Sequence, residues 1–68
     1  MVLANAVLQA GVQVGEHVIV NANSTIDGDA ILEDFSSIYP NSYIGGGAHI
    51  TESKSVGPNI VIERNIIF

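Results

Sequence analysis

Residues 20–50, VNANSTIDGDAILEDFSSIYPNSYIGGGAHI, carry an aliphatic residue at every sixth position. The same spacing extends in both directions, and each position reached in steps of six holds an aliphatic residue or phenylalanine. These positions are Val2, Leu8, Val14, Val20, Ile26, Leu32, Ile38, Ile44, Ile50, Val56, Ile62 and Phe68. An α-helix, with its 3.6-residue turn, would not keep a period of six on one face. The period therefore predicts short strands joined by regular corners.

Two further positions of each hexad are sorted by residue type. Side chains two residues apart in a strand point to the same face, so the position two residues before each aliphatic should also point inward. That second inward column holds Ala6, Val12, Val18, Ser24, Ala30, Ser36, Ser42, Ala48, Lys54, Ile60 and Ile66. The position three residues after each aliphatic is rich in Asn, Gly and Asp, which tolerate a positive φ and so indicate a corner. The corner positions are Asn5, Gly11, His17, Asn23, Asp29, Phe35, Asn41, Gly47, Ser53, Asn59 and Asn65.

The sequence also has a longer period of eighteen residues, which is seen in Asn5, Asn23, Asn41 and Asn59. Three hexads then make one triangular coil, and successive coils stack at about 4.8 Å. We predict an all-β fold, a parallel β-helix of just under four coils, with residues 1–68 forming a single domain. That length exceeds the roughly three repeats that a solenoid needs for stability.

Composition excludes several classes of partner. The chain has seven acidic side chains and only two basic ones, Lys54 and Arg64. The resulting formal charge of -5 argues against nucleic acid or an anionic membrane as a partner. No apolar run approaches the roughly 20 residues of a membrane span. Residues 1–11 lack the basic start of a signal peptide and fit the repeat, so we interpret them as folded protein. Without cysteine there is neither a disulfide nor a thiolate metal site. We expect a cytoplasmic protein with no bound metal or cofactor.

Apolar residues also occupy the outward column that lies between the two inward ones. Its apolar members are Val7, Ile19, Ile31, Tyr43, Val61 and Ile67. Val7, Tyr43 and Val61 share one face with Thr25 as its only polar member, which predicts a lateral interface. Scattered surface hydrophobics are the alternative interpretation. Neither end carries an obvious cap, so we expect possible end-to-end stacking and a truncated or engineered fragment of a longer protein.

The stretch 20–50 resembles the core of the hexapeptide-repeat sugar acyltransferases, which modify sialic acid or bacterial amino sugars with acetyl-CoA. Residues 57–66, GPNIVIERNI, resemble the later coils of such enzymes, so the resemblance covers most of the chain. It implies a left-handed coil and a homotrimer whose active groove lies between neighbouring subunits. The residues that match the family's Asn, Asp-His-Asp, His-Ile-x-Pro and glycine motifs are Asn21, Asp27, Asp29, Ile38, Pro40, Gly45, Gly46 and Gly47.

Both family histidines are replaced in this chain. The resemblance places the general base between Asp27 and Asp29, where this sequence has Gly28, and the second histidine at Ser37. Glycine cannot supply proton transfer, which contributes roughly 10² to 10⁴ in rate. No catalytic set is therefore intact, and the two aspartates remain as supporting residues. Natural loss of activity and deliberate mutation explain the replacements equally well.

The same resemblance implies a weak cofactor site. Gly46 is the implied backbone N–H donor to a thioester carbonyl, and Gly47 and Lys54 are the other candidate cofactor-binding residues. Three glycines also suit a tight corner without any function. Coenzyme A carries several phosphate charges, and only Lys54 and Arg64 are available to bind them.

We therefore predict a structural, self-associating module without catalysis. The alternative is a working acyltransferase that uses acetyl-CoA as co-substrate. A zinc site bridging subunits through His17 and His49, and an ice-binding face using Thr25 and Thr51, are weaker alternatives because neither pair shares a column.

Overall fold

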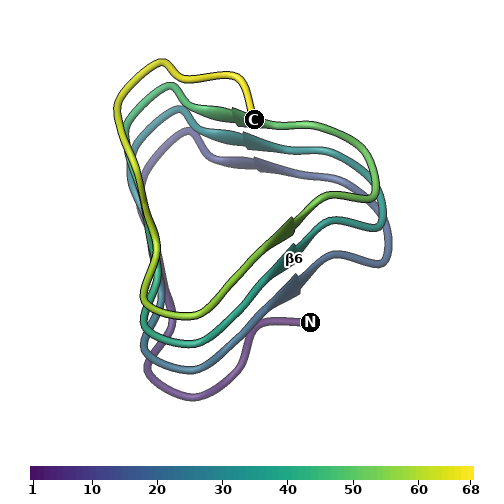
Figure 1. Cartoon of the computed structure of the whole chain (residues 1–68), viewed down its shortest axis with the longest axis vertical. Helices are drawn as coiled ribbons and strands as arrows, with labels where there is room; N and C mark the ends of the chain where they lie inside the picture. The colour runs from purple at the N-terminus through teal and green to yellow at the C-terminus, as the bar shows by residue number, and fades with distance from the viewer.

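The computed structural model describes residues 1–68 and contains ten two-residue strands and no helix. The strands are β1 (Val7–Leu8), β2 (Gln13–Val14), β3 (Ile19–Val20), β4 (Thr25–Ile26), β5 (Ile31–Leu32), β6 (Ser37–Ile38), β7 (Tyr43–Ile44), β8 (His49–Ile50), β9 (Ser55–Val56) and β10 (Val61–Ile62). They form three parallel sheets, ordered β1-β4-β7-β10, β2-β5-β8 and β3-β6-β9. Each sheet is one side of a triangular β-solenoid (Figure 1).

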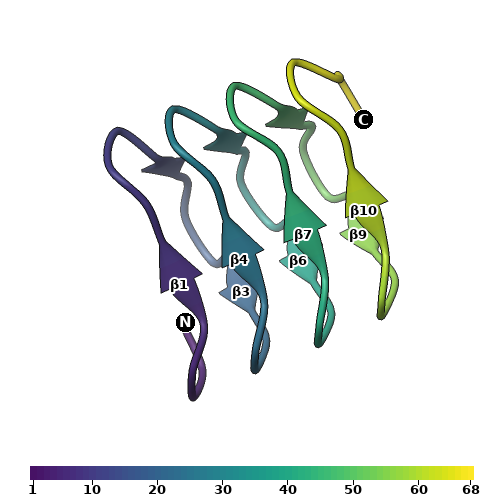
Figure 2. The same cartoon turned by 90° about the vertical axis from the view of Figure 1, so that its left-hand side faces the viewer.

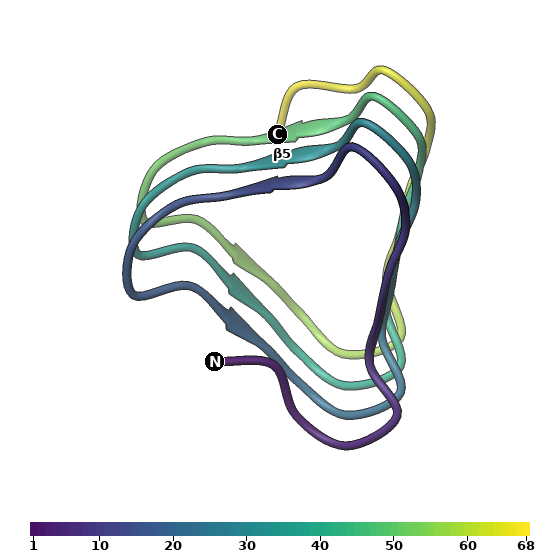
Figure 3. The same cartoon turned by 180° about the vertical axis from the view of Figure 1, so that it is seen from behind.

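Successive turns stack in register, eighteen residues apart. Val7 pairs with Thr25 and Thr25 with Tyr43, so every eighteenth residue returns to the same place in the next turn. The turns follow one another along a single axis (Figure 2). In Figure 1 the chain runs clockwise while it advances toward the viewer, and in Figure 3 it runs anticlockwise while it recedes. Both views describe a left-handed coil.

The ten strands make three complete turns and one further strand. This is fewer than the nearly four turns expected from length, because pairing at the two ends is reduced to single bridges. Those bridges join Val2 to Val20 and His49 to Ile67.

All eleven predicted corner residues have a positive φ, which confirms the corner prediction. Nine are not glycine, and their φ values lie between 58° at His17 and 64° at Asp29. Asn and Asp adopt this conformation more readily than other residues with a Cβ. At one corner the unusual pair His17 and Phe35 stack in successive turns, with ring centroids 5.1 Å apart. Each ring thus packs against the other, which offsets part of the cost of a corner residue that is neither Asn, Asp nor Gly.

The core lies on the axis of the triangle, as predicted, but only in the middle turns. The aliphatic positions from Val20 to Ile62 are all buried. Val2, Leu8, Val14 and Phe68 are 48%, 38%, 43% and 41% exposed, because no turn covers them at the ends.

The second inward column is buried from Val18 to Ala48. The last members of this column, Lys54, Ile60 and Ile66, are exposed because they belong to the last turn. The buried serines of this column are satisfied by backbone carbonyls, and Ser42 Oγ donates to Gly57 O at 2.8 Å. A polar side chain is tolerated on the axis because each hydroxyl has such a partner.

The outward apolar residues are exposed as predicted, except for the half-buried Ile31. Val7, Thr25, Tyr43 and Val61 form one continuous column across β1, β4, β7 and β10. The structure has no helix that could span a membrane.

Candidate functional site

The structure brings the predicted glycines together at one corner, between the β1-β4-β7-β10 and β2-β5-β8 sheets. Residues 27–29 follow β4 and residues 45–47 follow β7, so the two segments lie in successive turns. The N–H of Gly47 donates to Gly28 O at 3.0 Å. A Cβ built on Gly46 would lie 3.4 Å from the same carbonyl oxygen, so Gly28 and Gly46 lie next to each other.

Asp27 is held by two hydrogen bonds at this corner. Tyr43 Oη donates to its Oδ2 at 2.5 Å, and the N–H of Gly28 donates to its Oδ1 at 2.7 Å. The hydrogen bond from Tyr43, the one from Gly28 and the positive charge of Arg64 lower the pKa of Asp27 from 3.8, against a smaller opposing effect of burial. A carboxylate with a lowered pKa is a poorer proton acceptor. Asp27 is therefore unsuited to act as the general base that the resemblance implies at position 28.

Tyr43 is affected in the opposite sense by the same contact. Its hydrogen bond to Asp27, burial and the negative charge of Asp27 raise the pKa of Tyr43 above 10.0. The phenol therefore stays protonated to a higher pH than a free tyrosine and serves as a donor to the carboxylate.

Gly28 itself offers no side chain to the site. A Cβ at Gly28 would meet only Ala10 O, at 3.3 Å, so a larger residue fits there after a small adjustment. Asp29 lies at the corner with φ 64° and is exposed. Its Oδ1 lies over Gly11, where a Cβ would come within 2.1 Å of that oxygen. Asp29 therefore covers a neighbouring glycine in the preceding turn.

Of the three consecutive glycines, only Gly46 keeps an unpaired N–H. The N–H of Gly45 donates to Ile62 O at 2.7 Å and that of Gly47 to Gly28 O. Gly46 makes no such donation. It is the residue that the resemblance implies as donor to a thioester carbonyl.

Ser37 and Lys54 lie elsewhere in the triangle. Ser37 is in β6, on the β3-β6-β9 side, where it pairs with Ile19 and Ser55. Lys54 lies between β8 and β9, at a different corner from Gly46, and its Nζ is 5.9 Å from the centroid of the Phe68 ring. One copy of the chain therefore does not bring Gly28, Ser37 and Lys54 into a common site.

A shallow hollow of about 410 Å³ lies on the outer face next to the Asp27–Tyr43 contact. It is lined by Tyr43, Val61, Glu63 and Arg64. Arg64 offers the one cationic group in this hollow, and Glu63 offsets it. Such a lining has little net attraction for the phosphates of a nucleotide.

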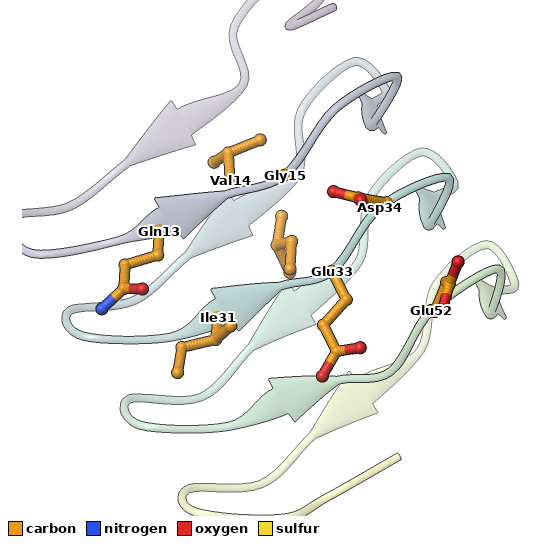
Figure 4. A pocket seen from close by; sticks show the side chains of 8 residues that line it. Gln13, Val14, Gly15, Ile31, Glu33, Asp34 and Glu52 are labelled. Carbon is orange, nitrogen blue, oxygen red and sulfur yellow. The ribbon is translucent and has the colours of Figure 1, made fainter.

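A second hollow, of about 290 Å³, lies on the β2-β5-β8 side (Figure 4). Its lining residues are Gln13, Val14, Gly15, Ile31, Leu32, Glu33, Asp34 and Glu52. Sequence reasoning missed this hollow, although Asp34 and Glu52 are eighteen apart and must stack in successive turns. His49 pairs with Glu33 beside it. Three carboxyl groups without a lysine or arginine disfavour an anionic ligand here.

The histidines do not meet. His17 is a corner residue with φ 58°, whereas His49 is a strand residue that pairs in register with Ile31. No group of three or more His, Cys, Asp or Glu side chains is arranged to hold a metal ion.

Comparison with known proteins adds no assignment to this geometry. No family model, no curated protein and no solved structure matches the chain.

Proposed function

We propose that this chain is a structural β-solenoid module that associates with copies of itself and transfers no acyl group. The observation that carries the proposal is the environment of Gly28. The position that the resemblance assigns to the general base has no titratable group, and the neighbouring Asp27 is held in its ionised form by Tyr43. Without a base, the acceptor hydroxyl or amine keeps its proton.

Self-association is supported by exposed apolar surface. Val7, Tyr43 and Val61 are 44%, 37% and 65% exposed and stand in one column on the flat β1-β4-β7-β10 sheet. An exposed column of mainly apolar residues, interrupted only by Thr25, is typical of an interaction surface. A homotrimer is the part of this proposal that rests on the resemblance, and a cytoplasmic location is proposed with it. The formal charge of -5 supports the exclusion of nucleic acid and anionic membranes as partners.

The second candidate is a functional acyltransferase that moves an acetyl group from acetyl-CoA to a sugar hydroxyl or amine. The unpaired N–H of Gly46, close to Asp27 and Gly28, favours it, because such a donor stabilises a developing oxyanion. Against it stand the missing base and the separation of Lys54 from this corner.

Acetyl transfer separates the two candidates. Transfer from acetyl-CoA to amino sugars is measured for the unmodified chain, for Gly28→His with Ser37→His, and for Gly28→Ala with Ser37→Ala as a matched control. We expect no turnover by the unmodified chain or the alanine control. Turnover by the unmodified chain would overturn the proposal. Activity restored only by the two histidines would identify the replacements as the cause of inactivity.

A further inference from the structure

The middle strand of the β3-β6-β9 side has an exposed aromatic residue at each end. Phe35 lies at the corner before β6 and Tyr39 directly follows β6, and the two residues are 55% and 44% exposed. Turns of the chain lie on both sides of β6, so this exposure belongs to the face of the solenoid and not to either end (Figure 1). Four residues at about 3.3 Å each place the two Cα atoms up to about 13 Å apart. The side therefore offers two separate aromatic surfaces along one line.

The aromatic rings are flanked by small residues in the following turn. His17 of the preceding turn stacks on one face of the Phe35 ring, with centroids 5.1 Å apart and an angle of 15° between the planes. The other face of that ring is turned toward the following turn, where the residue eighteen positions later is Ser53. Gly57 stands in the same relation to Tyr39, and a Cβ built on Gly57 would have no neighbouring atom closer than 3.9 Å. There is thus open space beside each ring for a flat ligand.

Polar side chains without a partner in the chain lie between the two rings. Ser37 is in β6 and pairs in register with Ser55 of β9, and Asn21 precedes Tyr39 by eighteen residues. These three side chains and the phenol of Tyr39 make no hydrogen bond within the chain. Hydroxyl and amide groups of this kind offer both donors and acceptors to a ligand.

The outward positions of this side carry no charge. They are occupied by Ile19, Asn21, Ser37, Tyr39, Ser55 and Gly57. The corresponding positions of the other two sides include Asp27 and Glu63 on one and Glu33 on the other. Asp34 is next to Phe35 in the chain, but it lines the hollow on the β2-β5-β8 side. In a chain with a formal charge of -5, an uncharged side is matched to a neutral ligand.

The shape of this side does not suit a peptide. β6 is paired with a strand on both sides, so it has no free edge to which an extended peptide could add. Both hollows of the molecule lie elsewhere, and none of the outward residues of this side lines either of them. Protein partners anchor their binding on side chains that fill pockets, and this side has none.

A sugar chain has the chemistry that this surface lacks a partner for. The face of an aromatic ring is weakly negative, and it attracts the polarised C–H groups on the face of a sugar ring. The hydroxyl groups at the rim of the sugar are matched by the serine, asparagine and tyrosine groups between the two rings. An extended chain of neutral sugars lies flat and reaches both rings at once.

We propose that the β3-β6-β9 side binds an extended, neutral glycan chain, with one sugar ring against Phe35 and another against Tyr39. Ser37, Ser55 and Asn21 then bind the hydroxyl groups of the sugars between them. The glycan is bound and not modified, and the corner with Gly28 and Gly46 takes no part. The inference therefore rests neither on acyl transfer nor on the proposed self-association, which uses another side of the triangle.

NMR titration of the whole chain tests the proposal. The probes are cello-oligosaccharides and chito-oligosaccharides, which are extended and neutral, with curved malto-oligosaccharides and anionic oligogalacturonates for comparison. We expect the two extended probes to bind, with amide shifts confined to residues 35–39 and to residues 53–57 of the following turn. The curved and anionic probes should bind more weakly.

Three variants locate the binding. Phe35→Asn keeps a residue that suits the positive φ of 63°, and Tyr39→Ala removes the other ring, so each should weaken binding roughly three- to tenfold. Ser55→Glu places a larger, charged side chain between the rings and should abolish binding. Gln13→Glu is its matched control, because it adds the same charge at an exposed position on the β2-β5-β8 side, and it should leave binding unchanged. Circular dichroism checks that every variant is folded.

The other results would overturn the proposal. Absence of binding to both extended probes would exclude a glycan ligand, and binding that survives all three variants would place the site elsewhere. Shifts at residues 35–39 that depend on protein concentration without any glycan would show that this side is an interface between copies of the chain. Sedimentation measures self-association separately, so a failure of glycan binding is distinguished from a failure of the proposed function.

Discussion

Tyr43 and Asp27 lie sixteen residues apart in the chain and make a 2.5 Å hydrogen bond across adjacent turns. Because a turn contains eighteen residues, a separation of sixteen places the two side chains diagonally on one face of neighbouring strands. The contact couples the outer surface of β7 to the corner that contains Gly28.

Tyr43→Phe should raise the pKa of Asp27 back toward 3.8, because the largest cause of its lowering is removed. Asp27 has a lower pKa in the folded chain than in the unfolded one, so its contribution to stability is present above the unfolded pKa and is lost as pH falls through the folded pKa. The variant should therefore lose less stability between neutral and strongly acid pH. NMR titration of the Asp27 carboxyl and acid unfolding measure both effects. Tyr39→Phe is the control, and an unchanged Asp27 titration in Tyr43→Phe would contradict the contact.

Tyr43 also contributes to the pH dependence of stability in the alkaline range. Its folded pKa lies above 10.0, so this part of the stability is present below the unfolded pKa and is lost as pH rises through the folded pKa. Ultraviolet absorption follows phenolate formation. With Asp27→Asn the phenol should ionise at lower pH than in the unmodified chain, and an equal or higher midpoint would be inconsistent with the hydrogen bond.

Burial along the axis predicts a gradient of core energies. Ile44→Ala should lower the free energy of unfolding by about 2 to 5 kcal/mol, because Ile44 is fully buried. Leu8→Ala removes a side chain that is 38% exposed and should cost only about 1 to 2 kcal/mol at concentrations where the chain is monomeric. Urea unfolding of both variants tests this order. Equal losses would mean that the end turns are packed as tightly as the middle.

Substitutions at two glycines, one closely packed and one open, test how tightly the turns pack against each other. A Cβ on Gly45 would lie 2.6 Å from the backbone nitrogen of Arg64, whereas one on Gly57 meets nothing closer than Ile60 Cγ1 at 3.9 Å. Gly45→Ala should lower the free energy of unfolding by about 1 to 3 kcal/mol. Gly57→Ala should stay within about 0.5 kcal/mol of the unmodified chain. Thermal unfolding measures both, and a neutral Gly45→Ala would show that the turns separate easily.

The corners allow a test of backbone conformation alone. Asn41 has φ 62°, so Asn41→Ala should cost about 1 kcal/mol while Asn41→Gly stays near neutral. Chemical denaturation of the two variants provides the comparison. Similar losses in the glycine and alanine variants would mean that the Asn41 side chain, rather than its backbone conformation, stabilises the corner.

Much of the fold follows from local chemistry repeated at a fixed spacing. The corner residues were predictable because Asn, Gly and Asp accept a positive φ, and their column placed even Phe35 correctly. Burial was predictable only where a turn has neighbours on both sides. Lys54 belongs to an inward column, yet it is exposed because its turn is the last.

Less of the candidate site was predictable. The neighbourhood of Gly28 and Gly46 follows from the period of eighteen, because the two glycines are eighteen positions apart. The Asp27–Tyr43 hydrogen bond was missed because it joins different columns and depends on the side-chain conformations of both residues. Ser37 is separated from Gly28 because it lies in β6, on another side of the triangle from the corner between β4 and β5. A groove between subunits is a property that the spacing within one chain does not specify.

The exact register of eighteen residues constrains how such a chain changes in length. Each turn contacts only the turns beside it, so duplication of any eighteen-residue segment inserts one complete turn and restores every column beyond it. A single inserted residue instead moves every later aliphatic side chain off the axis. Insertions and deletions in this solenoid are therefore tolerated best in multiples of eighteen residues, because only whole turns preserve the register.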